Sequence, residues 1–186
     1  MASSFEIKST RPSVGETIVT IVRDHIDYRK QIFKLAGSDL RRTYRASALG
    51  WSWAIIKPLV TIFVYWFAFA IGLRRGGDIE GYPFVLWLIS GIVPWFYMSE
   101  MLTLGTECIL RNRYLVTKMK YPVSTIPTFT SISKFSVHLI LMMITILIFV
   151  ITGNELTIYL VQLPFYMLCN FLFFTGWAMF AAPIAA

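Results

Sequence analysis

Four long apolar stretches fill nearly all of the chain after its first 54 residues. An α-helix needs about 20 mostly apolar residues to cross the hydrocarbon core of a bilayer. Backbone amides and carbonyls find no water in that core, so a single spanning segment has to be helical to satisfy them. The sequence therefore predicts an all-α membrane protein with four transmembrane helices, at about residues 55–73, 84–104, 126–151 and 156–182.

The composition agrees with a membrane location. Hydrophobic residues make up 56% of the chain, above the roughly 45–50% of soluble domains. The 186 residues leave room for a transmembrane domain at 55–186 and an N-terminal segment at 1–54, without a second globular domain. Cys108 and Cys169 are too few and too far apart to suggest a disulfide framework or a zinc site. We interpret both as packing residues.

The net charge of +7 is unevenly distributed along the chain. Nine Lys or Arg residues precede the first span and four more lie in the loop between spans two and three, whereas Arg74 and Arg75 in the first loop are offset by Asp78 and Glu80. Positive residues stay on the cytoplasmic side of a membrane protein. We therefore expect a multi-pass protein of the cytoplasmic membrane with its N-terminus inside and residues 74–82 outside. The basic charge then serves topology and contact with anionic membrane lipid, and we expect no nucleic-acid partner.

A charged amphipathic helix is predicted before the first span. Ser13 and Glu16 have the spacing of a capping box at its start. Apolar residues between positions 14 and 35 share one face and charged residues the other, which favours a helix lying in the membrane interface. A soluble helix packed on a partner protein remains the alternative, and both can hold at once. Gly37 is expected to end this helix, and Ser38-Asp39 to cap the next one.

Several side chains in the predicted spans are candidates for function. Glu100 lies near the cytoplasmic end of span two, where solvation at the interface is favoured over a proton relay. Lys134 in span three can extend to the interface or pair with Glu100 across helices. Tyr65, Trp66 and Phe69 in span one are candidates for rings that line a channel and stack on sugars. Ordinary packing against lipid is the alternative for each ring.

Sequence motifs of enzymes are absent from the chain. It contains no Walker A pattern, no HExxH, no GxSxG and no His, Cys and carboxylate cluster at metal-ligand spacing. We therefore expect a protein that is not itself an enzyme and binds neither cofactor nor metal. If it is a transporter, its energy comes from another subunit.

Three sequence blocks resemble the permease subunits of type 2 ABC exporters for polysaccharides, which include the O-antigen, capsule and wall teichoic acid exporters. The blocks are DLRRTYRASALGWSW at 39–53 with Lys57-Pro58 after it, GIVPWFYMSE at 91–100, and ILRNRYLVTKMKYP at 109–122. The segments at 64–74, 81–84 and 132–135 are more similar to the teichoic-acid branch than to the O-antigen branch.

The resemblance implies a six-span permease that works as a homodimer with two copies of a cytosolic ATP-binding-cassette ATPase. ATP and Mg would be bound by that ATPase, not by this chain. The cargo would be a cell-envelope polysaccharide of teichoic-acid or O-antigen type, linked to a polyprenyl diphosphate. Because the chain ends in apolar sequence after the fourth span, it is expected to represent the N-terminal two-thirds of such a permease.

The resemblance also suggests roles for two basic segments. The loop after span two would be the ATPase coupling loop, through Arg113, Tyr114, Leu115 and Lys118. Arg41, Arg42 and Arg45 would contact the lipid diphosphate, because guanidinium groups suit phosphate oxygens. Binding of ordinary lipid head groups, together with topology, is an equally good explanation of these arginines.

On one helix Arg41 and Arg45 share a face, whereas Arg42 is rotated by about 100° from Arg41. We therefore expect Arg41 and Arg45 to act together and Arg42 to serve topology alone. Two other functions stay open for the chain: a type 2 ABC exporter of a drug or lipid, and a non-transport membrane scaffold of glycan assembly.

Overall fold

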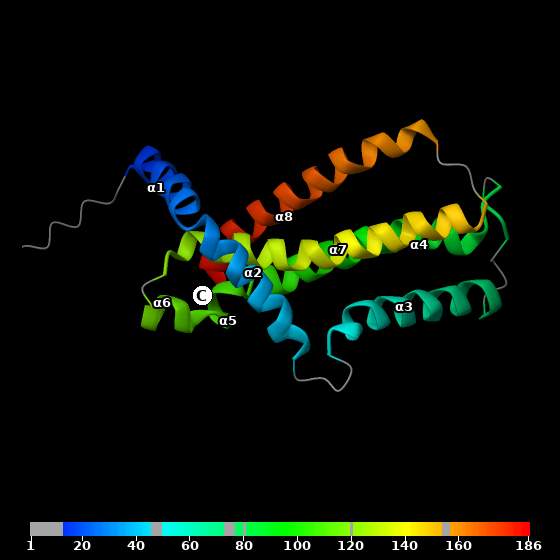
Figure 1. The fold of residues 1–186 in the computed structure, drawn as a ribbon, viewed down its shortest axis with the longest axis horizontal. Helices are drawn as coiled ribbons and strands as arrows, with labels where there is room; N and C mark the ends of the chain where they lie inside the picture. Colours follow the sequence, from blue (N-terminus) through cyan, green and yellow to red (C-terminus); the bar gives the residue numbers. More distant parts are fainter. Residues whose placement is uncertain (1–12, 46–49, 73–76, 80, 120, 154–156) are drawn as a thin grey trace, which may run out of the picture.

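Four apolar helical segments form the body of the structure (Figure 1). The computed structural model describes residues 13–45, 50–72, 77–79, 81–119, 121–153 and 157–186. The four segments are Trp53–Gly72, Phe84–Gly105, Val123–Ile151 and Ile158–Ala185. Both ends of each segment lie within three residues of the prediction, so the four spans and the all-α class are confirmed. Arg74, Arg75 and Glu80, which entered the charge comparison of the first loop, lie outside the described residues.

Each span consists of an α-helix with a tighter or wider turn at one end. The first two end in π-helical turns and the last two begin with 3-10 turns. The elements are α3 (Trp53–Trp66) followed by η2 (Phe67–Gly72), α4 (Phe84–Glu100) followed by η3 (Met101–Gly105), η4 (Val123–Thr125) followed by α7 (Ile126–Ile151), and η5 (Ile158–Gln162) followed by α8 (Leu163–Ala185).

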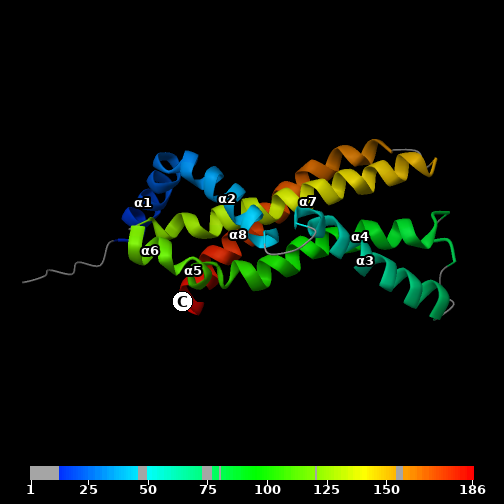
Figure 2. The ribbon, with the colours of Figure 1, turned by 60° about the horizontal axis from the view of Figure 1, so that its bottom comes forward.

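The remaining helices gather at one end of the spans, together with the C-terminal end of α8 (Figures 1 and 2). They are α1 (Val14–Asp27), α2 (Arg29–Tyr44), α5 (Cys108–Arg111) and α6 (Arg113–Met119). A short turn, η1 (Gly50–Ser52), leads into α3. The segment before span one and the loop between spans two and three therefore lie on the same side of the bundle, as expected for two segments separated by two spans.

The N-terminal helix begins as predicted. The Ser13 side chain accepts from the Glu16 amide at 3.2 Å, and the Glu16 carboxylate accepts from the Ser13 amide at 2.9 Å. Along α1, the apolar side chains of Val14, Ile18 and Val22 are all more than half exposed. This apolar face is therefore open to a membrane interface or to a partner protein.

The end of that helix was predicted wrongly. The chain breaks at Tyr28, and α2 then continues through Gly37 and past Ser38-Asp39. A side chain at Gly37 would meet no other atom within 4 Å. A glycine inside a helix costs about 1 kcal/mol, and packing of Ile32 and Ala36 in a buried cluster offsets that cost.

Contacts distant in sequence explain why the break falls at Tyr28. The Tyr28 ring meets Tyr121 edge-on, with ring centroids 5.5 Å apart. The Ser124 hydroxyl donates to the Asp24 carboxylate at 2.7 Å, and His25 Nε2 lies 2.8 Å from the Thr128 hydroxyl. These contacts attach the end of α1 to the segment that begins span three.

Three buried clusters hold the helices together. The first joins α2, α5, α6 and the start of α7 to the end of α8, the second joins α3, α4 and α7, and the third joins α4, η3 and α8. Ala54 and Ile62 are the buried residues of α3, so most of that helix presents apolar side chains outward. Outward-facing apolar surface along a span is the surface that lipid covers.

Candidate functional site

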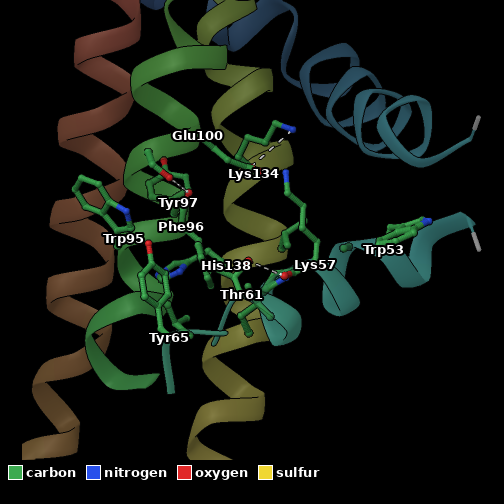
Figure 3. A pocket seen from close by; sticks show the side chains of 16 residues that line it. Trp53, Lys57, Thr61, Tyr65, Trp95, Phe96, Tyr97, Glu100, Lys134 and His138 are labelled. Carbon is green, nitrogen blue, oxygen red and sulfur yellow. Dashed lines mark hydrogen bonds and ion pairs between the residues drawn. The ribbon is translucent and has the colours of Figure 1, made fainter. Parts of the chain in front are cut away.

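The best candidate for a site is a cavity of about 260 Å³ between α3, α4 and α7 (Figure 3). Its lining combines aromatic rings with charged groups, which is unusual inside a membrane-spanning bundle. The rings come from Trp53, Tyr65, Trp95, Phe96 and Tyr97, and the ionisable groups from Lys57, Glu100, Lys134 and His138.

Helical spacing brings these residues to one place. Trp53, Lys57, Thr61 and Tyr65 are four residues apart on α3, so they share a face. Lys134 and His138 have the same spacing on α7. The sequence analysis singled out Tyr65, Glu100 and Lys134 as candidates. The four-residue spacing on α3 and α7 is the signal that would have added Trp53, Lys57, Thr61 and His138.

An ion pair spans the cavity wall. Lys134 Nζ lies 3.9 Å from Glu100 Oε2, which joins α7 to α4. The Lys134 side chain is only 6% exposed, whereas that of Glu100 is 40% exposed. Of the two alternatives for Lys134, pairing with Glu100 is therefore the one found. Because the ammonium is the more buried partner, it depends on the pair more than the carboxylate does.

A chain of hydroxyl groups lies beside the ion pair and connects three helices. Tyr97 OH lies 2.8 Å from Ser131 Oγ, and Ser131 Oγ lies 2.6 Å from Thr175 Oγ1. Thr175 Oγ1 donates to the carbonyl of Phe171 at 2.7 Å. Since a carbonyl only accepts, the direction of the whole chain follows: Ser131 donates to Thr175, and Tyr97 donates to Ser131. The chain fixes α4, α7 and α8 relative to one another.

His138 completes the polar wall of the cavity. Its ring stacks on Tyr97 with centroids 5.5 Å apart and an interplanar angle of 28°. The residue is 3% exposed, and its Nδ1 atom has no hydrogen-bond partner among the described residues. A buried ring nitrogen without a partner is costly unless a ligand or water supplies one. The cavity therefore offers hydrogen-bond donors and acceptors next to aromatic faces.

Of the three rings predicted to line a channel, the structure keeps Tyr65 and Phe69 together and places Trp66 elsewhere. Tyr65 lines the cavity, and its ring stacks with that of Phe69 at 6.4 Å. Phe69 and Tyr65 also line a neighbouring hollow between α3 and α4, with Trp87 and Trp95. Trp66 packs instead against Phe63, at 5.9 Å between ring centroids.

The three arginines of the N-terminal segment lie at the end of α2, outside the cavity lining. All three arginines are exposed. Arg42 Nη2 lies 3.7 Å from Asp39 Oδ1 and donates to Asn112 Oδ1 at 3.4 Å. Arg42 is thus in contact with the loop after span two, which the sequence analysis did not anticipate.

The predicted coupling loop consists of α5 and α6 with Asn112 at the joint between them. Arg113, Tyr114 and Lys118 are exposed on α6. Leu115 is 2% exposed and packs in the cluster that contains Ile32 of α2. Leu115 therefore supports the fold, and the other three residues form the surface of the loop.

Burial changes the acidity of two groups outside the spans. It raises the pKa of the Cys108 thiol to about 12, and it also raises the pKa of the Tyr121 phenol. Both groups stay protonated at neutral pH. Within the described ranges, no group of three or more His, Cys, Asp or Glu residues is placed to hold a metal ion.

Known proteins resemble this chain along most of its length. The family described as "ABC-2 type transporter" matches residues 30–186. The chain is 29% identical over 130 residues to the O-antigen export system permease protein RfbA of Myxococcus xanthus, which covers 68% of this chain and 48% of that protein. It is 28% identical over 93 residues to the protein of the same name from Klebsiella pneumoniae, covering 50% and 34%. The chain thus spans half or less of the length of these curated relatives.

Proposed function

The chain belongs to the ABC-2 type transporter family, and on that premise we propose that it forms the membrane permease of an exporter that moves a cell-envelope polysaccharide across the cytoplasmic membrane. The observation that carries this proposal is its similarity to two O-antigen export permeases, across 68% and 50% of the chain. The cavity chemistry supports it as well. Sugar hydroxyls both donate and accept hydrogen bonds, and sugar rings stack on aromatic faces.

The driving force in this proposal is ATP hydrolysis by a separate subunit. Two copies of that ATPase bind ATP and Mg, and two copies of the permease form the conduit. With the N-terminus cytoplasmic, the end of the bundle that carries α1, α2, α5 and α6 faces the ATPase. The exposed side chains of Arg113, Tyr114 and Lys118 are the contact surface on α6.

The cargo in this proposal is a polymer of teichoic-acid or O-antigen type on a polyprenyl diphosphate. Arg41 and Arg45 recruit the diphosphate, since both are exposed at the end of α2 and guanidinium groups bind phosphate through two parallel hydrogen bonds. Lysine at both positions should preserve the orientation of the protein, because the positive charges remain. It should slow export, because an ammonium lacks the planar fork. Export at the parental rate would show that the two arginines only determine topology.

Deletion of the gene tests the proposal as a whole. The deletion strain should lose polysaccharide from its surface while lipid-linked polymer accumulates on the cytoplasmic side, and the restored gene should reverse both. An exporter of drugs would instead leave surface polysaccharide unchanged and alter drug resistance. An assembly scaffold would leave no lipid-linked polymer to accumulate. Polymer in the membrane and on the surface at parental amounts would refute the proposal.

A further inference from the structure

The contact between Arg42 and Asn112 connects two helical segments that are 70 residues apart in sequence. Arg42 lies near the end of α2, and Asn112 is the joint between α5 and α6. We propose that Arg42 is a positioning residue that transmits movement of the α5–α6 loop to α2, and through α2 to span one. This inference rests on the proposed function, since the loop is taken to be where the ATPase acts.

Every polar group of Asn112 forms a hydrogen bond at the joint between α5 and α6. Its side-chain amide donates to the Cys108 carbonyl at 2.8 Å, and its backbone carbonyl accepts from the Leu115 amide at 2.9 Å. The first bond uses the amide nitrogen, so the amide oxygen is the atom left for Arg42. Asn112 is 4% exposed. Without Arg42, this oxygen would be buried without a charged donor.

Arg42 is itself held by its own helix. The Arg42 side chain is 48% exposed, and its guanidinium lies 3.7 Å from the carboxylate of Asp39, whose side chain is 13% exposed, one turn earlier on α2. A guanidinium presents several donors in a rigid plane, so one group can contact Asp39 and Asn112 together. Asp39 thus orients Arg42 toward the joint.

Apolar packing alone would not define the orientation of the two segments. Leu115 shares a buried cluster with Ile32 and Ala36 of α2, but apolar contacts are non-directional and allow helices to slide. A hydrogen bond to a charged donor requires a particular distance and angle. Arg42–Asn112 therefore sets the register of α2 against the α5–α6 joint.

Movement of α2 has a short route to the cavity. Leu40 of α2 packs against the buried cluster that contains Ala54 and Ile62 of α3. Trp53, Lys57 and Tyr65 of α3 form one wall of the cavity. A displacement of the joint that carries Arg42 with it would therefore move the start of span one and this wall.

The test compares Arg42→Gln with Arg29→Gln in the permease assembled with its ATPase. The two variants lose the same charge on the same helix, and Arg29 is exposed at the opposite end of α2. The measured quantity is the amount of glycan exported per ATP hydrolysed. Arg42→Gln should lower this ratio by about fivefold, the factor expected for loss of one ordinary hydrogen bond, with ATPase association unchanged. Arg29→Gln should stay within about twofold of the parent.

A double-mutant cycle separates this role from a merely structural one. Asn112→Leu should lower the ratio as Arg42→Gln does, and the double variant should be no worse than either single one. Losses that multiply in the double variant, or equal ratios for Arg42→Gln and Arg29→Gln, would overturn the proposal. If Arg42→Gln does not accumulate in the membrane, Arg42→Lys replaces it: an intermediate ratio is expected, and a parental ratio overturns the role of the guanidinium. A parental permease that exports no glycan would instead refute the proposed function.

Discussion

The ion pair between Lys134 and Glu100 should respond asymmetrically to removal of its two charges. At 3.9 Å and an effective dielectric constant of ~20, the attraction between two unit charges is about 4 kcal/mol. The net contribution is smaller, because both groups were desolvated to form the pair. The loss in the free energy of unfolding that each substitution causes depends on how buried the remaining charge is.

Glu100→Gln leaves an ammonium whose side chain is 6% exposed, and we expect it to lower the free energy of unfolding by about 3 kcal/mol. Lys134→Met leaves a carboxylate that is 40% exposed and reaches solvent at the interface, so the loss should be about 1 kcal/mol. The double variant leaves no charge uncompensated and should resemble Lys134→Met. Its loss should therefore be about 3 kcal/mol smaller than the sum of the single losses.

The measurement is unfolding of the purified permease in mixed detergent micelles, titrated with SDS and followed by tryptophan fluorescence. Lys57→Met is the matched control, because Lys57 lines the same cavity but is exposed. It should change the free energy of unfolding by less than about 0.5 kcal/mol. The reasoning would be refuted if Lys134→Met were as destabilising as Glu100→Gln, or if the two losses were additive.

Three further predictions concern the loops and the buried thiol. In a variant without native cysteines, a cysteine at Asp78 should react with an impermeant reagent in intact cells and one at Lys118 should not; the reverse pattern would refute the topology. Tyr114→Asp should leave the permease in the membrane but reduce export per ATP hydrolysed. Leu115→Asp should instead reduce the amount of protein in the membrane, because it would bury a carboxylate. Equal protein amounts for the two variants, measured by immunoblot, would contradict this. The Cys108 thiol, with a pKa of about 12, should resist N-ethylmaleimide at pH 8 until the protein is denatured, since the thiolate is the reactive form; mass spectrometry of the labelled peptide measures it.

Features that depend on neighbouring residues alone were predicted well. The four spans follow from the length and apolar character of continuous segments, which a bilayer imposes on any helix that crosses it. The capping box of Ser13 and Glu16 is a contact over three residues. Its formation requires no other part of the chain.

Features that balance local preference against packing were predicted less well. Gly37 is a typical helix-ending residue, yet α2 continues through it because Ile32 and Ala36 are buried against other helices. The chain breaks at Tyr28 instead, where Tyr121 contacts its ring. The sequence suggested that Leu115 is part of an exposed loop surface. It lies instead on the face of the short helix α6 that packs against the bundle, and it is buried.

The sequence by itself determined how many times the chain crosses the membrane, which segments do so, and where basic charge gathers. Only the tertiary structure decided which side chains meet: that Lys134 pairs with Glu100, that Arg42 rather than Arg41 or Arg45 contacts Asn112, and that Trp66 packs against Phe63 and is not part of the cavity lining that includes Tyr65. The physical reason is that hydropathy and capping act over a few residues. The rotation and crossing of each helix instead depend on how all the helices pack, and a rotation of one residue, about 100°, changes every partner on a face.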